Sequence, residues 1–262
     1  MASPLPRRIL FTVDVEEFDT AVEFGHDIPL SEQIAVSTRG LRALAERFDA
    51  LSARTTLFTT ANYALHEPAL MKQLAQKHEV ASHGYYHTTF EPADLATSKA
   101  ALEGLLGQPI RGFRRARMGA TNPDDLLAAG YVYNSSLHPT FIPGRYNHWG
   151  EPRLPFNEKG IWQIPASVTP RLRLPLFWLS LKNFPFAMYK QLCLQTLKAD
   201  GFVNIYVHPW EFTDLSAYDK IPTYVKRYSR ADLLDRVEAL LRFLAPHGDY
   251  ATMGEFVETI NG

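Results

Sequence analysis

Cysteine is almost absent from this 262-residue chain, which holds only Cys193 and therefore cannot form a disulfide within itself. Such usage is typical of a reducing compartment. Leucines flank Cys193, which favours a small core residue over a nucleophile. Long apolar runs are also missing, because the most apolar stretch, Leu174–Leu181, is too short to span a bilayer. With no apolar leader at the N-terminus, we expect a cytoplasmic protein without a transmembrane segment.

The chain also has no marked excess of positive or negative charge. The chain has 27 Lys and Arg against 28 Asp and Glu, a formal net charge of −1. This balance disfavours nucleic acid or an anionic membrane surface as the main partner. The sequence also lacks a Gly-x-Ser-x-Gly elbow, a phosphate-binding glycine loop, a dinucleotide fingerprint and a cysteine-pair metal site. Serine-nucleophile chemistry, nucleotide hydrolysis and hydride transfer therefore have no local support.

What is present is an alternation of short β-branched or aromatic runs with helical patterns, typical of a mostly parallel sheet covered by helices. Predicted strands span residues 9–15, 55–60, 79–82, 110–116, 131–136, 160–165 and 202–208. Predicted helices span 31–51 (opened by Ser31), 67–78 (with Pro68 in its first turn), 94–107, 121–130, 188–201 and, as the last, 229–244. We therefore predict one α/β domain, 1–262, with an incomplete or distorted (β/α) barrel of about seven strands. Its active site should lie where strands meet the loops that follow them.

Acidic residues close the first predicted strand, in TVDVEEF (12–18). Side chains alternate along a strand, so Asp14 and Glu16 share one face, and Glu17 turns away if the strand continues that far. Two like charges on one face repel unless a cation or an arginine joins them. The alternative is that both carboxylates are simply solvated at an exposed strand end.

Two histidines follow the third predicted strand, in VASHGYYHTT (80–89). His83 and His87 have zinc-protease spacing, but that motif needs Glu after the first His, and Gly84 stands there. Gly-Tyr-Tyr is also a poor helix interior, so we expect a strand end that runs into a turn. Two imidazoles with one carboxylate are a recurring ligand set for a catalytic divalent metal, and two ordinary histidines are the alternative.

A third histidine ends the last predicted strand, in VNIYVHPWEF (203–212). The proline after His208 favours an extended backbone there. His208 is a candidate proton donor to a leaving group, although it could instead cap the strand while Trp210 fills the core. In GFRRARMG (112–119), one of three arginines could pair with a cleft carboxylate while the others stay solvated.

In chain order, TVDVEE, TTLFTTANY, EVASHGYYH, GFRRARMG, GYVYNSSL and IYVHPWEF resemble the successive motifs of the polysaccharide deacetylase family. The resemblance runs from about residue 9 to 257 and includes YATMGEFV near the end. It implies an incomplete (β/α) barrel and a metal-dependent hydrolase that removes N- or O-acetyl groups from sugars. The chain is similar to a branch with one residue between the two acids. Asp14 then matches the base, Glu16, His83 and His87 the metal ligands, and His208 the catalytic acid.

Two positions depart from the family pattern. Arg114, which the resemblance pairs with Asp14 to keep it ionised, is followed by residues 115–117 (Arg-Ala-Arg) instead of proline. This implies an altered loop at the acyl pocket. Asn134 stands where relatives carry an aspartate that orients the acid histidine, and an amide cannot stabilise an imidazolium by charge.

Cofactor and partners follow from the resemblance. Zinc suits the ligand set best, with cobalt or nickel also possible. We expect an N-acylated sugar or glycan precursor as substrate, with contacts from Trp210, Asn134 and Tyr86. A lipid-linked precursor of a surface glycan or O-antigen-type polysaccharide fits an aromatic insert at 171–189, which otherwise is a loop packed on the barrel. Hydrolysis of a non-sugar amide or formamide, a metal-binding carbohydrate module without turnover, and a structural role in glycan assembly remain alternatives.

Overall fold

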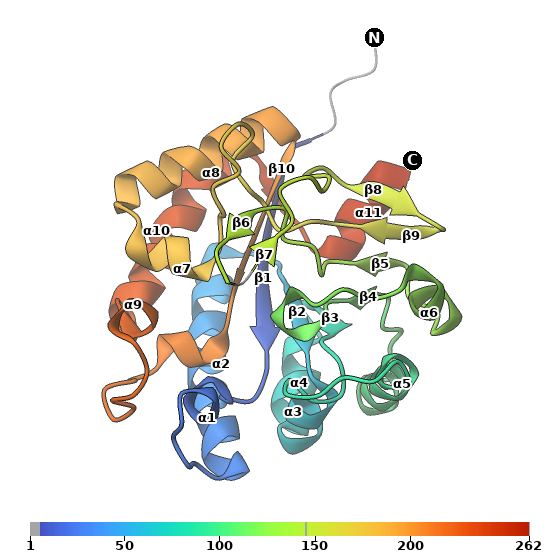
Figure 1. Cartoon of the computed structure of the whole chain (residues 1–262), viewed down its shortest axis with the longest axis vertical. Coiled ribbons are helices and arrows are strands. Elements are labelled where there is room, and N and C mark those ends of the chain that lie inside the picture. The colour runs from blue at the N-terminus through green and yellow to red at the C-terminus, as the bar shows by residue number, and fades with distance from the viewer. Residues whose placement is uncertain (1–5, 145, 262) are drawn as a thin grey trace.

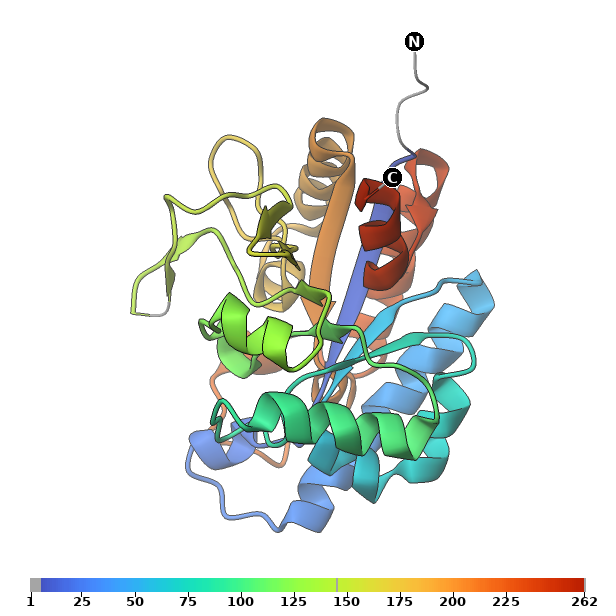
Figure 2. The same cartoon turned by 90° about the vertical axis from the view of Figure 1, so that its right-hand side faces the viewer.

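The computed structural model describes residues 6–144 and 146–261 and has a strongly curled parallel sheet at its centre (Figures 1 and 2). Its parallel strands are β1 (Arg8–Val15), β2 (Thr56–Thr59), β3 (Glu79–Ser82), β4 (Gly112–Phe113), β5 (Tyr133–Asn134), β9 (Ile161–Gln163) and β10 (Phe202–Val207), in the order β10-β1-β2-β3-β4-β5-β9. Antiparallel β8 (Phe156–Glu158) extends the sheet beyond β9, and β11 (Asp249–Tyr250) pairs with the start of β1. β6 (Phe141–Ile142) and β7 (Tyr146–Asn147) form a separate hairpin. All seven predicted strands are confirmed in position.

The barrel is open between β9 and β10. No strand pair joins them in the described part of the chain; the segment after β9 bridges the gap instead. Ser167 N donates to Asn204 O over 2.9 Å, and Asn204 N donates to Ser167 Oγ over 2.8 Å. The side-chain amide of Asn204 also donates to Pro165 O over 3.0 Å. The predicted incomplete (β/α) barrel is therefore confirmed.

Helices cover the outside of the sheet. They are α1 (Thr20–Glu23), α2 (Leu30–Leu51), α3 (Ala61–His66), α4 (Pro68–Leu74), α5 (Asp94–Leu106), α6 (Pro123–Ala128), α7 (Trp178–Asn183), α8 (Phe186–Asp200), α9 (Thr223–Lys226), α10 (Ala231–Leu244) and α11 (Met253–Asn261). Short 3-10 turns are η1 (Ala116–Met118), η2 (Pro209–Phe212) and η3 (Ala245–His247). α10 packs against both α2 and α8. None of the described helices combines the length and apolarity needed to cross a membrane.

Some predicted boundaries are wrong for local reasons. Pro29, not Ser31, precedes the first residue of α2. The predicted strand 110–116 is limited to Gly112–Phe113, and the 3-10 turn η1 begins at Ala116, where Arg117 and Met118 adopt positive φ angles of 57° and 54°. The predicted helix 67–78 ends at Leu74.

The helix predicted as the last one is followed by another, α11. Thr252 and Glu255 form a reciprocal capping box before it: Thr252 N donates to Glu255 Oε2, and Glu255 N donates to Thr252 Oγ1. This Thr-x-x-Glu signal is readable in the sequence and identifies a helix start.

β1 carries the start of the site. It is buried almost throughout, as expected for a strand covered on both faces. Phe11 and Val13 belong to the main hydrophobic cluster, which extends from Ile9 in β1 to Leu244 in α10. Thr12 and Asp14 occupy the alternate face, and both contact Arg114. The alternation in β1 therefore separates a packing face from a polar face.

Candidate active site

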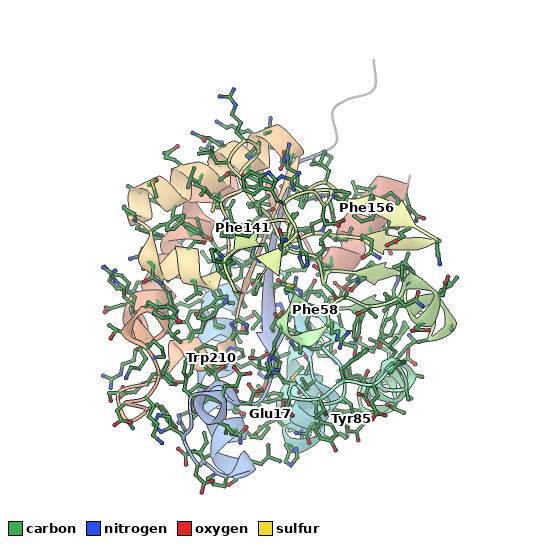
Figure 3. The ribbon with its side chains drawn as sticks, in the orientation of Figure 1. Glu17, Phe58, Tyr85, Phe141, Phe156 and Trp210 are labelled. Atoms are coloured by element: carbon green, nitrogen blue, oxygen red, sulfur yellow. The ribbon has the colours of Figure 1, made fainter. Side chains whose placement is uncertain are left out.

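The candidate site lies at the carboxyl ends of the parallel strands. Glu16 directly follows β1, His83 follows β3, Arg114 follows β4 and His208 follows β10. Because these ends meet at one edge of a parallel barrel, the four side chains converge there. A cavity of about 450 Å³ opens at this edge, lined by Asp14, Glu16, His83, His87, His208 and Trp210 among others. Figure 3 labels Trp210 and Glu17 at the lower end of β1.

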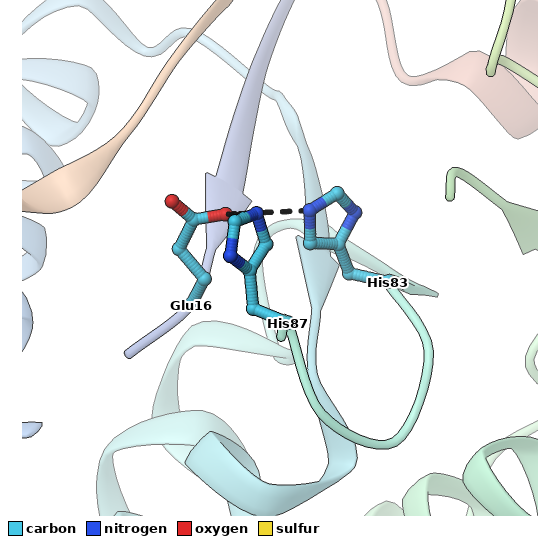
Figure 4. Close-up of side chains that lie close together, drawn as sticks. All are labelled: Glu16, His83 and His87. Atoms are coloured by element: carbon cyan, nitrogen blue, oxygen red, sulfur yellow. Dashed lines mark ion pairs between the residues drawn. The ribbon is translucent and has the colours of Figure 1, made fainter. Parts of the chain in front are cut away.

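Three potential metal ligands point at one another (Figure 4). Glu16 Oε2 lies 3.4 Å from His83 Nε2 and 3.0 Å from His87 Nε2, and all three atoms lie within 4.8 Å of one another. Glu16 and His83 are only 1% and 2% exposed. Within residues 6–144 and 146–261, Glu16 Oε2 and His83 Nε2 make no hydrogen bond of good geometry. Buried polar atoms normally have a partner, and two imidazole nitrogens with a carboxylate oxygen fit a divalent ion such as zinc.

Outer contacts fix the orientation of each ligand. His83 Nδ1 lies 2.8 Å from Arg114 O, and since a carbonyl only accepts, Nδ1 donates there and Nε2 is the nitrogen that faces the other two ligands. His87 Nδ1 lies 2.6 Å from Asp19 Oδ2. Trp210 Nε1 donates to Glu16 Oε1 over 3.1 Å. Such second contacts are what orient metal-binding side chains and tune their basicity.

The turn after β3 explains the spacing of the two histidines. Gly84 has a φ of 91°, which side chains rarely adopt, and it lets the chain reverse directly after His83. The amides of Ala61 and Asn62 at the start of α3 donate to Gly84 O and Tyr85 O, each over 3.0 Å. The turn is therefore fixed on α3, and it returns His87 to the side of the cleft where His83 lies.

Charge in this cluster favours a cation. Burial alone would raise the pKa of Glu16, but the charges of His87 and His208 and the contacts with His83 and His87 outweigh it, so this pKa is held well below its usual value. Burial likewise opposes a charged His87, but Glu16 and Asp19 raise its pKa well above the usual value. The same carboxylates that favour a proton on His87 would attract a divalent ion to the three ligand atoms.

Asp14 and Arg114 form a buried pair beside the ligand set. Arg114 Nη1 donates to Asp14 Oδ1 over 2.5 Å and to Thr12 Oγ1 over 2.9 Å. Its other nitrogens donate to Ser135 O and Ser135 Oγ, and the guanidinium lies 4.0 Å from the ring centroid of Phe58. Arg114 is fully buried, so the predicted pairing of one arginine with a cleft carboxylate is confirmed.

The other two arginines behave differently. Arg117 is half exposed at the mouth of the cleft and pairs with Glu23 and Asp19. Arg115 is partly exposed and lies over the ring of Phe90. Both keep contact with solvent, as predicted, but Arg117 also pairs with carboxylates at the cleft, which the prediction gave to one arginine alone.

His208 lines the same cavity, where Glu211 and Trp210 hold its ring in place. Its Nδ1 is 3.0 Å from Glu211 Oε1, and the same oxygen accepts from His208 N over 2.8 Å. Its ring stacks on Trp210 with a centroid distance of 5.3 Å and an interplanar angle of 18°. Burial opposes a charged His208, but Glu16, Glu211 and Asp14 raise its pKa above the usual value. This arrangement suits a proton donor.

The residues predicted to contact substrate have different positions. Trp210 lines the cavity but is only 1% exposed, and its indole nitrogen is bonded to Glu16. Asn134 donates to Gln163 Oε1 over 2.8 Å and accepts from Ser136, and it lines a separate, smaller cavity. Tyr86 is 46% exposed and is not among the residues that line the cleft in the described chain. The structure therefore brings Trp210, but not Asn134 or Tyr86, to the cleft.

The orienting residues are a correction to the sequence analysis. Asn134 directs its side-chain hydrogen bonds to Gln163 and Ser136, and Glu211 holds the imidazole of His208 instead. Asp19 on His87 was missed as well. Glu211 follows His208 by three residues at a proline-started turn, a signal that could have identified it. No sequence pattern places Asp19 against His87, because only the chain path after β1 brings them together.

No family model and no curated protein matches the chain, but solved structures do. A protein from Mycobacterium smegmatis assigned as a polysaccharide deacetylase is 19% identical with a TM-score of 0.66, over 100% of this chain and 93% of that one. The Puue allantoinase is 14% identical with a TM-score of 0.67, over 98% and 94%. A second protein assigned as a polysaccharide deacetylase, from Pseudomonas aeruginosa PAO1, is 15% identical with a TM-score of 0.66, over 96% and 90%. These TM-scores show that the chain shares its fold with all three structures.

Proposed function

We propose that this protein is a metal-dependent hydrolase that removes an N-acyl group, acetyl first of all, from a sugar. The observation that carries the proposal is the joint presence of three functional units in one cavity. These are the ligand set Glu16, His83 and His87, the base candidate Asp14 with the buried Arg114 behind it, and His208. The fold shared with polysaccharide deacetylase structures supports the choice of reaction.

The residues divide the work of amide hydrolysis. A divalent ion held by Glu16, His83 and His87, zinc best of all, would supply Lewis acidity to water and to the acyl carbonyl. Asp14 takes the proton of the attacking water as general base, while Arg114 holds its carboxylate in place. His208 donates a proton to the departing amine nitrogen, because the contact of Nδ1 with Glu211 leaves Nε2 for the substrate.

The walls of the cavity support a glycan precursor with a lipid anchor as the substrate. Leu179 and Tyr224 line the cleft and also a neighbouring open groove of about 350 Å³ whose lining is almost wholly apolar. A molecule that joins a sugar to a hydrocarbon chain would fill both. The insert 171–189 contains α7 and the start of α8. Its Phe177, Trp178 and Leu181 pack in the main hydrophobic core, as the alternative of packing on the barrel expects, while its Leu179 lines the groove. We accordingly place the reaction in surface-glycan or O-antigen-type biosynthesis.

The test is a substrate panel of N-acetylated sugar oligomers, nucleotide sugars, lipid-linked sugars and formamides, with released acid measured on zinc-loaded protein. We expect acetate release from at least one sugar class, and a loss of about 10²-fold or more in Asp14→Asn. The matched control is Asp49→Asn, because Asp49 is exposed and pairs with Lys77 at the surface. This control should retain full activity.

Three results would contradict the proposal. Release only from formamides or other non-sugar amides would favour the alternative hydrolase. Bound zinc and sugar without release from any substrate, with Asp14→Asn equal to the unmodified protein, would favour a binding module. If a variant that lacks His83 binds zinc as tightly as the unmodified protein, then Glu16, His83 and His87 do not form the metal site.

A further inference from the structure

Lys182 is a fully buried lysine close to the proton donor. It lies in α7, and its Nζ is 2.7 Å from Glu211 Oε2, with neither side chain exposed. Nζ also donates to Val225 O over 2.8 Å. Neither Lys182 nor Glu211 is among the described residues that line the cleft. A buried ion pair is expensive to desolvate and is weak evidence for stability, so its location calls for another role.

Glu211 divides its two oxygens between two partners. Oε2 pairs with Lys182, and Oε1 accepts from His208 N and contacts His208 Nδ1. Because Oε2 is held by Lys182, the carboxylate cannot rotate without breaking the ion pair, and Oε1 stays on the imidazole. A carboxylate at Nδ1 fixes which nitrogen of a histidine carries the exchangeable proton and which one faces the substrate.

Lys182 also contacts the aromatic rings around His208. Its Nζ lies 5.3 Å from the ring centroid of Trp178 and 5.5 Å from that of Trp210. Trp210 stacks on His208, and Trp178 meets its edge at 5.3 Å and 89°. One buried cation therefore contacts both indoles that confine the imidazole and the carboxylate that orients it.

We propose that Lys182 is a positioning residue, which acts through Glu211 to hold His208 in the orientation and tautomer that a proton donor needs. The inference deepens the proposed function and rests on it, because it concerns the proton-transfer step. It also assigns a role to the insert: α7 supplies the wall of the cleft with Trp178 and, one helical turn on, the cation behind the proton donor.

The test compares Lys182→Met with Lys190→Met on zinc-loaded protein. Lys190 is the matched control because its ammonium lies over Phe186 and Phe243 and it is close to Lys182 in sequence. We expect Lys182→Met to lower kcat by about tenfold or more while KM and zinc content stay within about twofold. Lys182→Arg, which keeps the charge, should recover a large part of kcat, and Lys190→Met should match the unmodified protein.

A second measurement does not require turnover. In ¹⁵N-labelled protein, the Nδ1–H of His208, identified by its loss in His208→Gln, should exchange slowly with water. Lys182→Met should broaden or remove this signal, whereas Lys190→Met should leave it unchanged. If no substrate of the panel is hydrolysed, the proposed function fails, but this signal still decides the positioning by Lys182.

Several results would overturn the inference. Unchanged kcat and an unchanged Nδ1–H signal in Lys182→Met would do so, as would an equal loss of kcat in Lys190→Met. If Lys182→Met does not fold, it is replaced in the test by the double variant Lys182→Met/Glu211→Gln, which removes both charges of this pair. Its kcat should equal that of Glu211→Gln alone, because Lys182 acts through Glu211. A further drop below Glu211→Gln would contradict that route.

Discussion

Two carboxylates, Asp14 and Glu16, stand two residues apart in β1 and the turn after it, yet their surroundings give them different chemistry. Arg114 neutralises Asp14, whereas Glu16 accepts one hydrogen bond from Trp210 and directs its other oxygen at two imidazoles. A carboxylate fixed by arginine suits a base, and one with a free oxygen beside two imidazoles suits a metal ligand. At the scale of single residues, the partner decides the role.

The buried Glu211–Lys182 pair predicts a specific pH dependence of stability. Burial alone would raise the pKa of Glu211, but Lys182 and His208 outweigh it, so the pKa in the folded state lies below the ordinary value of 4.5. A lowered folded pKa means that ionised Glu211 stabilises the folded state above pH 4.5. That contribution is lost as the pH falls through the lower, folded value.

We expect Glu211→Gln to lower the free energy of unfolding by about 3 kcal/mol at neutral pH, because it leaves Lys182 buried and unpaired. The difference from the unmodified protein should shrink as the pH falls below 4.5. Urea denaturation at neutral and acidic pH measures both values. The exposed Glu46→Gln should stay within about 0.5 kcal/mol of the unmodified protein. A pH-independent difference for Glu211→Gln would contradict the assignment.

At the scale of elements, short turns after the strands determine the site. The β3 turn depends on Gly84, whose φ is 91°, while Gly104 lies on the exposed side of α5, where an added Cβ would meet nothing within 4 Å. Substitution by alanine should therefore change the stability of the protein in opposite directions at the two positions. One position needs a left-handed backbone, and the other is a helix interior where alanine is preferred.

We expect Gly84→Ala to lower the free energy of unfolding by about 1–2 kcal/mol, because alanine is strained at positive φ. It should also weaken zinc binding by about tenfold, since the turn returns His87 to Glu16. Gly104→Ala, the control, should be more stable by about 0.5–1 kcal/mol with unchanged zinc affinity. Chemical denaturation and competition with a chromogenic chelator measure the two effects. Equal zinc affinities in the two variants would show that the turn does not position His87.

At the scale of the whole molecule, the candidate metal site connects distant parts of the sheet. Glu16 follows β1, and His83 and His87 follow β3, with β2 between these strands. An ion that binds all three ligands therefore binds the folded chain only. Ligand binding restricted to the folded state raises stability by mass action.

Zinc at about 100 times its dissociation constant should stabilise the protein by about 2.7 kcal/mol and raise the melting temperature by about 5–10 °C. A chelator should reverse the shift. His83→Gln should show almost no shift, whereas His66→Gln should respond fully, because His66 is exposed on α3. Thermal unfolding followed by circular dichroism gives the result. An equal shift in His83→Gln would place zinc elsewhere.

Local sequence patterns predicted much of the fold and part of the candidate site. The alternation of strands and helices predicted a mostly parallel sheet, and the two-residue period of β1 predicted that Asp14 and Glu16 share a face. Both rest on contacts between near neighbours in sequence, which determine strand and helix formation. The short length of β4 escaped prediction, because the 3-10 turn that begins at Ala116 has no distinct signal in this stretch of arginine and alanine.

The sequence by itself determined which chemical groups stand at the strand ends, because period and turn residues are local properties. Only the tertiary structure decided which groups meet. Asp19 reaches His87 across 68 residues, Lys182 reaches Glu211 from another helix, and Asn134 is directed to Gln163 instead of His208. Those pairings depend on how the sheet curls and where α7 packs, and no local pattern encodes either. The sequence thus determined which side chains stand at the strand ends, and long-range packing determined which partner each of them contacts.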